Sequence, residues 1–141
     1  MKIALGRNGI NRQLMRMSFH FSERIRSFHH AFRGIGTVIR TQHNAWIHPV
    51  ATVGVVVFGL CLGLSHAEWC ALVFSIGIVW VAEALNTAVE FLADEISQER
   101  RELIGKAKDA GAAGVLLAAI SAAVIGLIVF VPHLMAWGEV R

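Results

Sequence analysis

The sequence predicts an all-α membrane protein with three transmembrane helices and an N-terminal amphipathic surface helix. Apolar residues make up 55% of the 141 residues, and the mean hydropathy is +0.58, which exceeds the usual range of a soluble domain of this size. Uncharged runs approach the roughly 20 residues that cross a hydrocarbon core as a helix. We therefore expect a short extension over residues 1–13 and a single membrane domain over residues 14–141.

The first expected element is a surface helix over about residues 14–40. Its apolar side chains recur in steps of three or four, which define one face of a helix: Leu14, Met17, Phe21, Ile25, Phe28, Phe32, Ile35 and Ile39. Arginines fall mostly off this stripe, a pattern typical of a helix that lies in the membrane interface. Periodicity leaves two roles open. In the first, the helix only anchors the protein to the membrane. In the second, it forms one side of a site where a lipid headgroup meets a cytoplasmic solute.

Three apolar runs predict the spans, at about residues 46–64, 69–92 and 110–131. Of the 13 basic residues, eight precede the first span, four lie between the second and third, and one follows the third. Because positive charge is retained in the cytoplasm, we expect the N-terminus and the 93–109 loop inside and the C-terminus outside. The net charge of +3 then reflects membrane topology, and no nucleic acid partner is expected.

The second span carries polar residues in steps of three, four and four, at Glu83, Asn86, Glu90 and Asp94. This spacing places them on one helix face that descends from the cytoplasmic surface into the hydrocarbon. A carboxylate at the depth of Glu83 costs about 3 kcal/mol or more unless it is protonated, paired or hydrated. Hydrogen bonding between helices would explain one asparagine, but two buried acids in addition favour a functional groove.

These residue types indicate phosphoryl transfer. Glu83, deep in the membrane, suits a general base or acid, and Glu90, nearer water, suits a ligand of Mg²⁺. At the entrance to the third span, Lys108 can neutralise a polyphosphate, and Asp109 can orient the lysine or assist the metal. Taken alone, this pair could equally be a charged flank that anchors a helix end.

Histidines and small residues form two further patterns. His29, His30, His43 and His48 precede the first span, but no pair shows the i, i+4 zinc arrangement beside an acid, so interfacial hydrogen bonding is the default expectation. Small residues recur every fourth position in the third span, and Gly59 and Gly63 do so in the first. Both series predict close helix packing, including packing between subunits.

The run Glu-Ala-Leu-Asn-Thr-Ala-Val-Glu at residues 83–90, followed by Asp94 and by Ala-Lys-Asp at residues 107–109, resembles the signature of the prokaryotic diacylglycerol kinase and undecaprenol kinase family. The resemblance extends from about Phe28 to His133. The segment Asn-Ala-Trp-Ile-His at residues 44–48 is more similar to the undecaprenol kinase branch.

This resemblance implies a homotrimer in the bacterial inner membrane whose active sites are shared between subunits. It implies a membrane lipid alcohol as substrate, ATP as co-substrate and Mg²⁺ as cofactor. Glu83 would be the catalytic base, Asn86 would position the reacting groups, and Glu90 would bind the metal that bridges the ATP phosphates. The residues expected to contact the nucleotide are Lys108, Asp109, Glu99, Arg101, Asp94 and His30.

Two positions depart from the family pattern. Gln42 stands where the family has a second metal-binding glutamate, and an amide oxygen holds Mg²⁺ less strongly than a carboxylate. Arg100 and Arg101 replace an aromatic–histidine pair, and an arginine there can stack on adenine or grip phosphate.

The hypothesis is ATP-dependent phosphorylation of a lipid hydroxyl at the cytoplasmic interface, with undecaprenol preferred over diacylglycerol. Two alternatives stay open: a proton-coupled carrier that uses the same acids, and an inactive membrane scaffold. Residues 70–81, in the outer half of the second span, carry no acidic or basic side chain, so a proton path would lack an exit.

Overall fold

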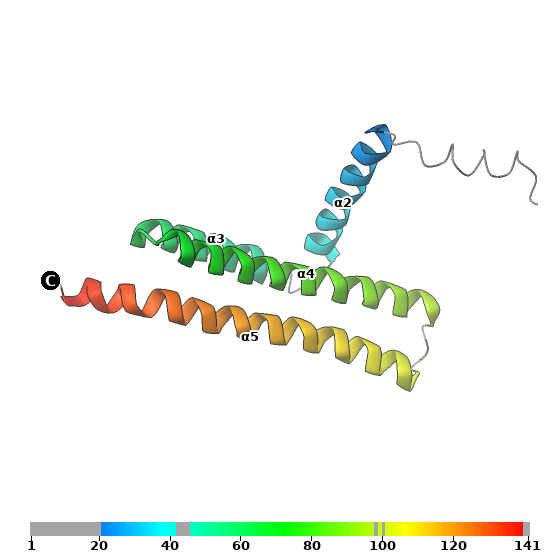
Figure 1. Ribbon diagram of the computed structural model, residues 1–141. Coiled ribbons are helices and arrows are strands. Elements are labelled where there is room, and N and C mark those ends of the chain that lie inside the picture. The colour runs from blue at the N-terminus through cyan, green and yellow to red at the C-terminus, as the bar shows by residue number, and fades with distance from the viewer. Residues whose placement is uncertain (1–20, 42–45, 98, 100, 140–141) are drawn as a thin grey trace, which may run out of the picture. The chain divides into compact units, whose positions relative to one another are not determined.

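The computed structural model describes residues 21–41, 46–97, 99 and 101–139. These residues form helices α2 (Phe21–Thr41), α3 (Ile47–Leu62), α4 (His66–Ile96) and α5 (Glu102–Glu139), joined by short connections (Figure 1). The prediction of an all-α chain is confirmed for this part of the molecule. The chain divides into two compact units, residues 1–34 and 35–141, and each is described by itself. The predicted extension over residues 1–13 lies outside the described residues.

Helix α2 carries the predicted surface stripe, although its description begins at Phe21 and Leu14 and Met17 lie outside the described part. Phe28 and Phe32 are 66% and 70% exposed, and Ile25 and Ile35 are exposed as well. Apolar side chains so open to the surroundings are typical of a helix whose partner is the membrane interface.

Helix α3 is shorter than the predicted span. Its 16 residues correspond to about 24 Å of helix, somewhat less than the thickness of a hydrocarbon core. Gly59 packs closely, as predicted, because a Cβ built there would lie 2.9 Å from Cη2 of Trp69 on α4. Gly63 does not: it has open space around it and ends the helix with φ +66°, a left-handed conformation that glycine adopts without strain. Gly63 therefore ends the helix in the described protomer, and its predicted packing against another subunit stays a prediction.

Helix α4 begins with a capping box that fixes its start three residues before the predicted span. The Glu68 amide donates to Ser65 Oγ, and Glu68 Oε2 accepts from the Ser65 amide at 2.7 Å. These bonds satisfy backbone donors that the first turn leaves without helical partners. The helix then continues for 31 residues to Ile96.

Helix α5 runs for 38 residues, longer than the predicted span over residues 110–131. It begins at Glu102, so the connection to α4 is only a few residues long, and Lys108 and Asp109 are helical rather than part of a loop over residues 93–109. The apolar run alone does not mark these ends, because charged residues at the membrane surface continue a helix as readily as apolar ones.

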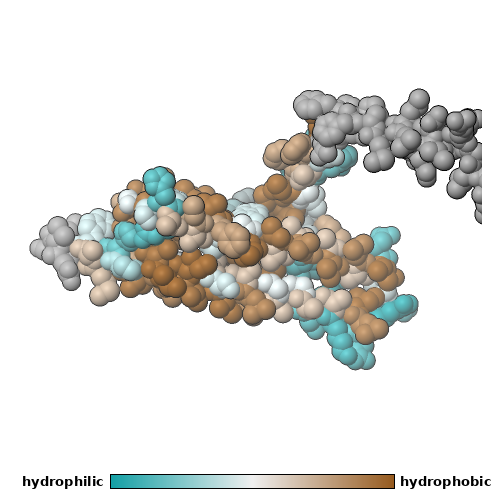
Figure 2. Space-filling view, viewed as in Figure 1, coloured by the Kyte–Doolittle hydropathy of each residue, from teal (hydrophilic) through white to brown (hydrophobic). Residues whose placement is uncertain are grey.

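Helix α4 packs against both α3 and α5 in the unit formed by residues 35–141. Leu64, Leu72 and Val129 form a small buried cluster, and most other apolar side chains are exposed. Figure 2 shows a mainly hydrophobic surface along these helices, with hydrophilic atoms around the α4–α5 connection. Helices α4 and α5 are each long and apolar enough to cross a membrane, whereas α3 is an apolar helix of 16 residues.

The end of α3 gives a first test. We expect Gly63→Ala to lower the free energy of unfolding by about 1 kcal/mol, because alanine resists the left-handed backbone conformation. Gly54→Ala is the matched control: Gly54 lies inside the same helix with open space around it, and alanine favours a helix interior. Denaturant unfolding in detergent micelles measures both variants. Equal stability of the two would contradict the assignment of Gly63 as the helix-ending residue.

Candidate functional site

The polar face of α4 becomes steadily more exposed toward its C-terminal end. Glu83 and Asn86 are 6% and 7% exposed, Glu90 is half-buried, and the Asp94 side chain is 67% exposed. The predicted shared face therefore agrees with the structure, and burial within the protomer decreases along it. Such a gradient leads from an apolar interior, where a carboxylate needs a partner, to a surface where water solvates it.

Asn86 and Glu90 are joined one helical turn apart. Asn86 Nδ2 donates a hydrogen bond to Glu90 Oε1 at 3.0 Å. This contact sets the orientation of the Asn86 amide, because a carboxylate only accepts hydrogen bonds and its oxygen must face the NH₂ group. The amide oxygen, Asn86 Oδ1, is then buried and has no hydrogen-bond partner. A buried acceptor without a hydrogen-bond partner lowers the stability of the fold. The Asn86 oxygen is therefore a candidate contact for a bound group.

Helix α5 approaches this amide at Gly111. A Cβ built on Gly111 would lie 2.5 Å from Asn86 Oδ1, so any larger residue would displace the amide. The sequence analysis predicted close packing for the series that contains Ala110 and Gly114, but Gly114 has open space around it within the described chain. Gly111 is therefore a site residue that the periodic pattern missed, because its role depends on a contact between two helices.

Helix α3 contributes a second residue that the sequence analysis did not place in the site. His48 Nε2 lies 3.6 Å from Glu83 Oε2, and the two side chains are 16% and 8% exposed. The His48 ring also lies beside the Trp80 ring, with 6.2 Å between their centroids. The sequence signal was a histidine at the start of an apolar run, which on its own does not show which acid it faces.

Lys108 lies at the exposed end of the polar face. Its Nζ atom is 2.5 Å from Asp94 Oδ1, and the two side chains are 38% and 67% exposed. A pair this open to solvent contributes at most about 1 kcal/mol to stability. An incoming polyphosphate can therefore replace Asp94 as the partner of Lys108 at little energetic cost.

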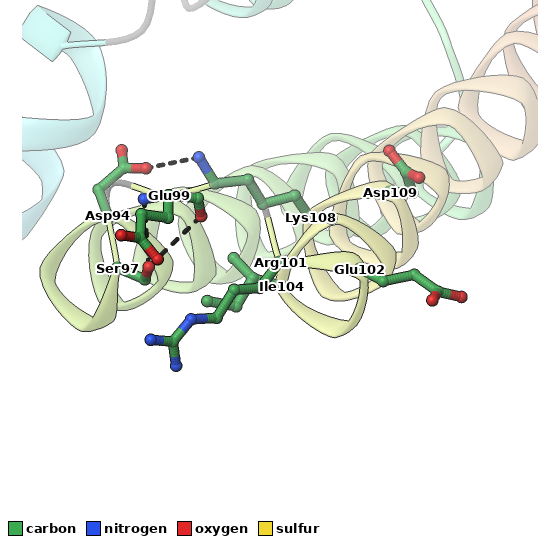
Figure 3. Close-up of a pocket in the computed structure, with 9 residues that line it drawn as sticks. Asp94, Ser97, Glu99, Arg101, Glu102, Ile104, Lys108 and Asp109 are labelled. Carbon is green, nitrogen blue, oxygen red and sulfur yellow. Dashed lines mark hydrogen bonds and ion pairs between the residues drawn. The ribbon is translucent and has the colours of Figure 1, made fainter.

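A pocket of about 710 Å³ surrounds this ion pair at the α4–α5 connection (Figure 3). Its polar lining includes five of the six residues predicted to contact a nucleotide: Asp94, Glu99, Arg101, Lys108 and Asp109. In Figure 3, Lys108 reaches toward Asp94, whereas the guanidinium of Arg101 points away from that pair. These five predicted residues therefore line one pocket, and their contacts with a nucleotide stay a prediction.

Two further predicted site residues, His30 and Gln42, lie outside the described part of the unit that holds this pocket. His30 is an exposed residue of α2, and its predicted nucleotide contact stays a prediction. Gln42 lies outside the described residues, so its predicted metal contact is likewise untested.

The donor set for a metal consists of Glu90 and its neighbours on α4. No group of three or more histidine, cysteine or acidic side chains within the described ranges is arranged to hold a metal ion. Mg²⁺ does not require one, because it usually binds through one or two carboxylates together with substrate phosphates and water. The half-buried carboxylate of Glu90, held at its Oε1 atom by Asn86 Nδ2, fits a metal held in that way.

Comparisons with known proteins agree with this site. Residues 29–130 match the family model described as prokaryotic diacylglycerol kinase. An undecaprenol kinase of Bacillus subtilis (strain 168) is 38% identical over 109 residues, which cover 77% of this chain and 89% of that protein. A diacylglycerol kinase of Synechocystis sp. is 35% identical over 111 residues, 78% of this chain and 63% of that protein.

A diacylglycerol kinase of Escherichia coli (strain K12) is 35% identical over 96 residues, covering 63% of this chain and 79% of that protein. The family match spans most of the chain and includes the whole polar face of α4 together with Lys108 and Gly111. The chain therefore belongs to the prokaryotic diacylglycerol kinase family and is a lipid kinase.

Proposed function

We propose that this lipid kinase transfers the γ-phosphoryl group of ATP to a lipid hydroxyl at the cytoplasmic surface of the bacterial inner membrane. The observation that carries the proposal is the graded burial along α4, from Glu83 at 6% exposure to Asp94 in a polar pocket. A membrane-soluble alcohol reaches the buried end of this face through the bilayer. A charged nucleotide reaches the open end from water.

Undecaprenol is the proposed acceptor, with diacylglycerol as the alternative. The support is the relative named undecaprenol kinase, which matches this chain over 89% of its own length. Relatives named diacylglycerol kinase match at 35% identity, so the choice rests on a modest difference in similarity.

Glu83 is the proposed base. Its carboxylate takes the proton of the lipid hydroxyl as the oxygen forms its bond to the γ-phosphorus. The bond from that phosphorus to the bridging oxygen breaks, and its electron pair leaves with ADP. Little covalent chemistry is left for the protein, so positioning and neutralisation of charge account for most of the catalysis.

Asn86, Glu90 and Lys108 supply that positioning. Asn86 fixes the Glu90 carboxylate by its 3.0 Å hydrogen bond, and Glu90 would hold Mg²⁺. When bound, the metal neutralises charge on the ATP phosphates and orients them. Lys108 exchanges Asp94 for phosphate oxygens, while Glu99, Arg101 and Asp109 line the same pocket for the rest of the nucleotide.

The proposed membrane arrangement has α3, α4 and α5 as three spans, with the N-terminus and the α4–α5 connection in the cytoplasm. The distribution of basic residues supports this orientation. A homotrimer is proposed because apolar side chains are exposed along all three helices, and one protomer offers few walls for a lipid site.

A panel of lipid alcohols tests the function. We expect purified protein with labelled ATP to phosphorylate undecaprenol more efficiently than diacylglycerol, and Glu83→Gln to abolish transfer while ATP still binds. Thin-layer chromatography identifies the labelled lipid, and a separate nucleotide-binding assay checks the variant. Full transfer by Glu83→Gln would show that Glu83 is not the base. Absence of any labelled lipid with the wild-type protein would refute the kinase proposal.

The role of Glu90 is tested by a magnesium titration. We expect Glu90→Gln to raise the Mg²⁺ concentration needed for half-maximal activity about tenfold or more, because an amide binds a hard cation less strongly than a carboxylate does. Glu95→Gln is the control, since Glu95 is an exposed acid on the same helix and outside the polar face. An unchanged titration for Glu90→Gln would exclude it as a metal ligand.

The contact at Gly111 gives a test that does not alter a polar group. We expect Gly111→Ala to lower kcat about tenfold or more, because the new Cβ displaces the Asn86 amide and breaks its bond to Glu90. Gly138→Ala is the control on the same helix, where a Cβ meets open space. Steady-state kinetics and thermal unfolding are measured together. Wild-type kcat in a folded Gly111→Ala protein would contradict this role.

A further inference from the structure

Three contacts fix the position of His48. Its Nε2 atom lies 3.6 Å from Glu83 Oε2, and its ring lies beside Trp80 at an interplanar angle of 59°. Its main-chain oxygen accepts a hydrogen bond from Thr52 Oγ1 at 2.7 Å. The first two contacts join the His48 side chain to α4, whereas the third lies within α3 and involves only the His48 main chain.

Thr52 and Trp80 connect the turn that carries His48 to α4. Thr52 Oγ1 donates its one proton to the His48 carbonyl, so its lone pairs remain available to accept from Trp80 Nε1 at 3.2 Å. Trp80 therefore contacts His48 in two ways, through its ring and through Thr52. Because Trp80 precedes Glu83 by three residues on α4, both ends of the His48 contact belong to one helix face.

The N-terminal end of α3 also lies close to this carboxylate, because His48 contacts Glu83 from the first turn of that helix. His48 is the second residue of α3, and the first turn of that helix contains no acidic residue. The N-terminal end of a helix carries a partial positive charge, which stabilises a nearby carboxylate. His48 Nε2 lies next to the Glu83 carboxylate at this end of the helix.

We propose that His48 is a positioning residue for the catalytic base, an inference that rests on the kinase function proposed above. The Nε2–H group of His48 directs itself at Glu83 Oε2, which holds the carboxylate in one orientation and leaves Oε1 for the lipid hydroxyl. A carboxylate is an acceptor only, so a histidine beside it presents a protonated nitrogen. The distance of 3.6 Å exceeds a hydrogen bond, and contacts of this kind commonly shorten when substrate binds.

The reaction stays balanced with His48 in this role. The lipid oxygen bonds to the γ-phosphorus, ADP leaves with the electron pair of the broken bond, and the hydroxyl proton moves to Glu83 Oε1. His48 keeps its own proton throughout. Its contribution is to the rate of transfer from bound substrates, and we expect it to leave the binding of ATP unchanged.

Two amide substitutions test whether the role of His48 depends on how far its hydrogen-bond donor extends or only on the presence of a donor. The side-chain NH₂ of glutamine extends about as far as Nε2 of histidine, whereas that of asparagine stops one methylene short. We expect His48→Gln to retain kcat within about threefold and His48→Asn to lower it about tenfold or more, with the KM for ATP unchanged in both. His66→Gln, at an exposed histidine near the start of α4, is the control for loss of a histidine.

The full-length protein is assayed in mixed micelles with labelled ATP and the best lipid acceptor, and nucleotide binding confirms that each variant is folded. The inference is overturned if both amide variants match the wild type, or if both lose kcat equally. A raised KM for the lipid at unchanged kcat would overturn it as well, and would make His48 a substrate contact. If only the role of His48 is wrong, the wild-type protein still phosphorylates lipid. If the proposed function is wrong, the wild-type protein labels no lipid.

Discussion

The burial of the Glu83 carboxylate is the constraint on which the site depends. A carboxyl group buried in an apolar environment requires a polar partner, and the two neighbouring helices shape this part of α4 in different ways. Helix α3 brings His48 and the positive end of its dipole to Glu83. Helix α5 approaches closely at Gly111, where the missing side chain leaves room for Asn86.

The contacts along α4 differ in strength in a way that matches their proposed tasks. The Asn86–Glu90 hydrogen bond is partly buried, so breaking it would leave the buried Asn86 amide without this partner and would be costly. The Lys108–Asp94 ion pair is open to solvent and weak, so it exchanges readily. Residues that must stay fixed during the reaction are thus held firmly, and the residue that must receive a nucleotide is held loosely.

The sequence predicted the polar face of α4 because the spacing of Glu83, Asn86 and Glu90 depends only on helix geometry. The ends of the helices were harder to predict from the sequence. The capping box at Ser65 and the left-handed turn at Gly63 arise from local backbone geometry, which a hydropathy pattern does not record. The roles of His48 and Gly111 were missed for a different reason. Both depend on which residues of α3 and α5 lie opposite α4, and one periodic pattern does not contain that register.

That register also relates the start of α3 to the site. The contacts of His48 with Glu83, of Thr52 with Trp80 and of Gly59 with Trp69 show α3 running antiparallel to α4. Helix α3 therefore starts at the level of Glu83, while α4 continues for about 20 Å beyond that point to Ile96. The contact at Glu83 gives the proposed base its partner, while Asn86 and Glu90 lie on the part of α4 that extends past the start of α3.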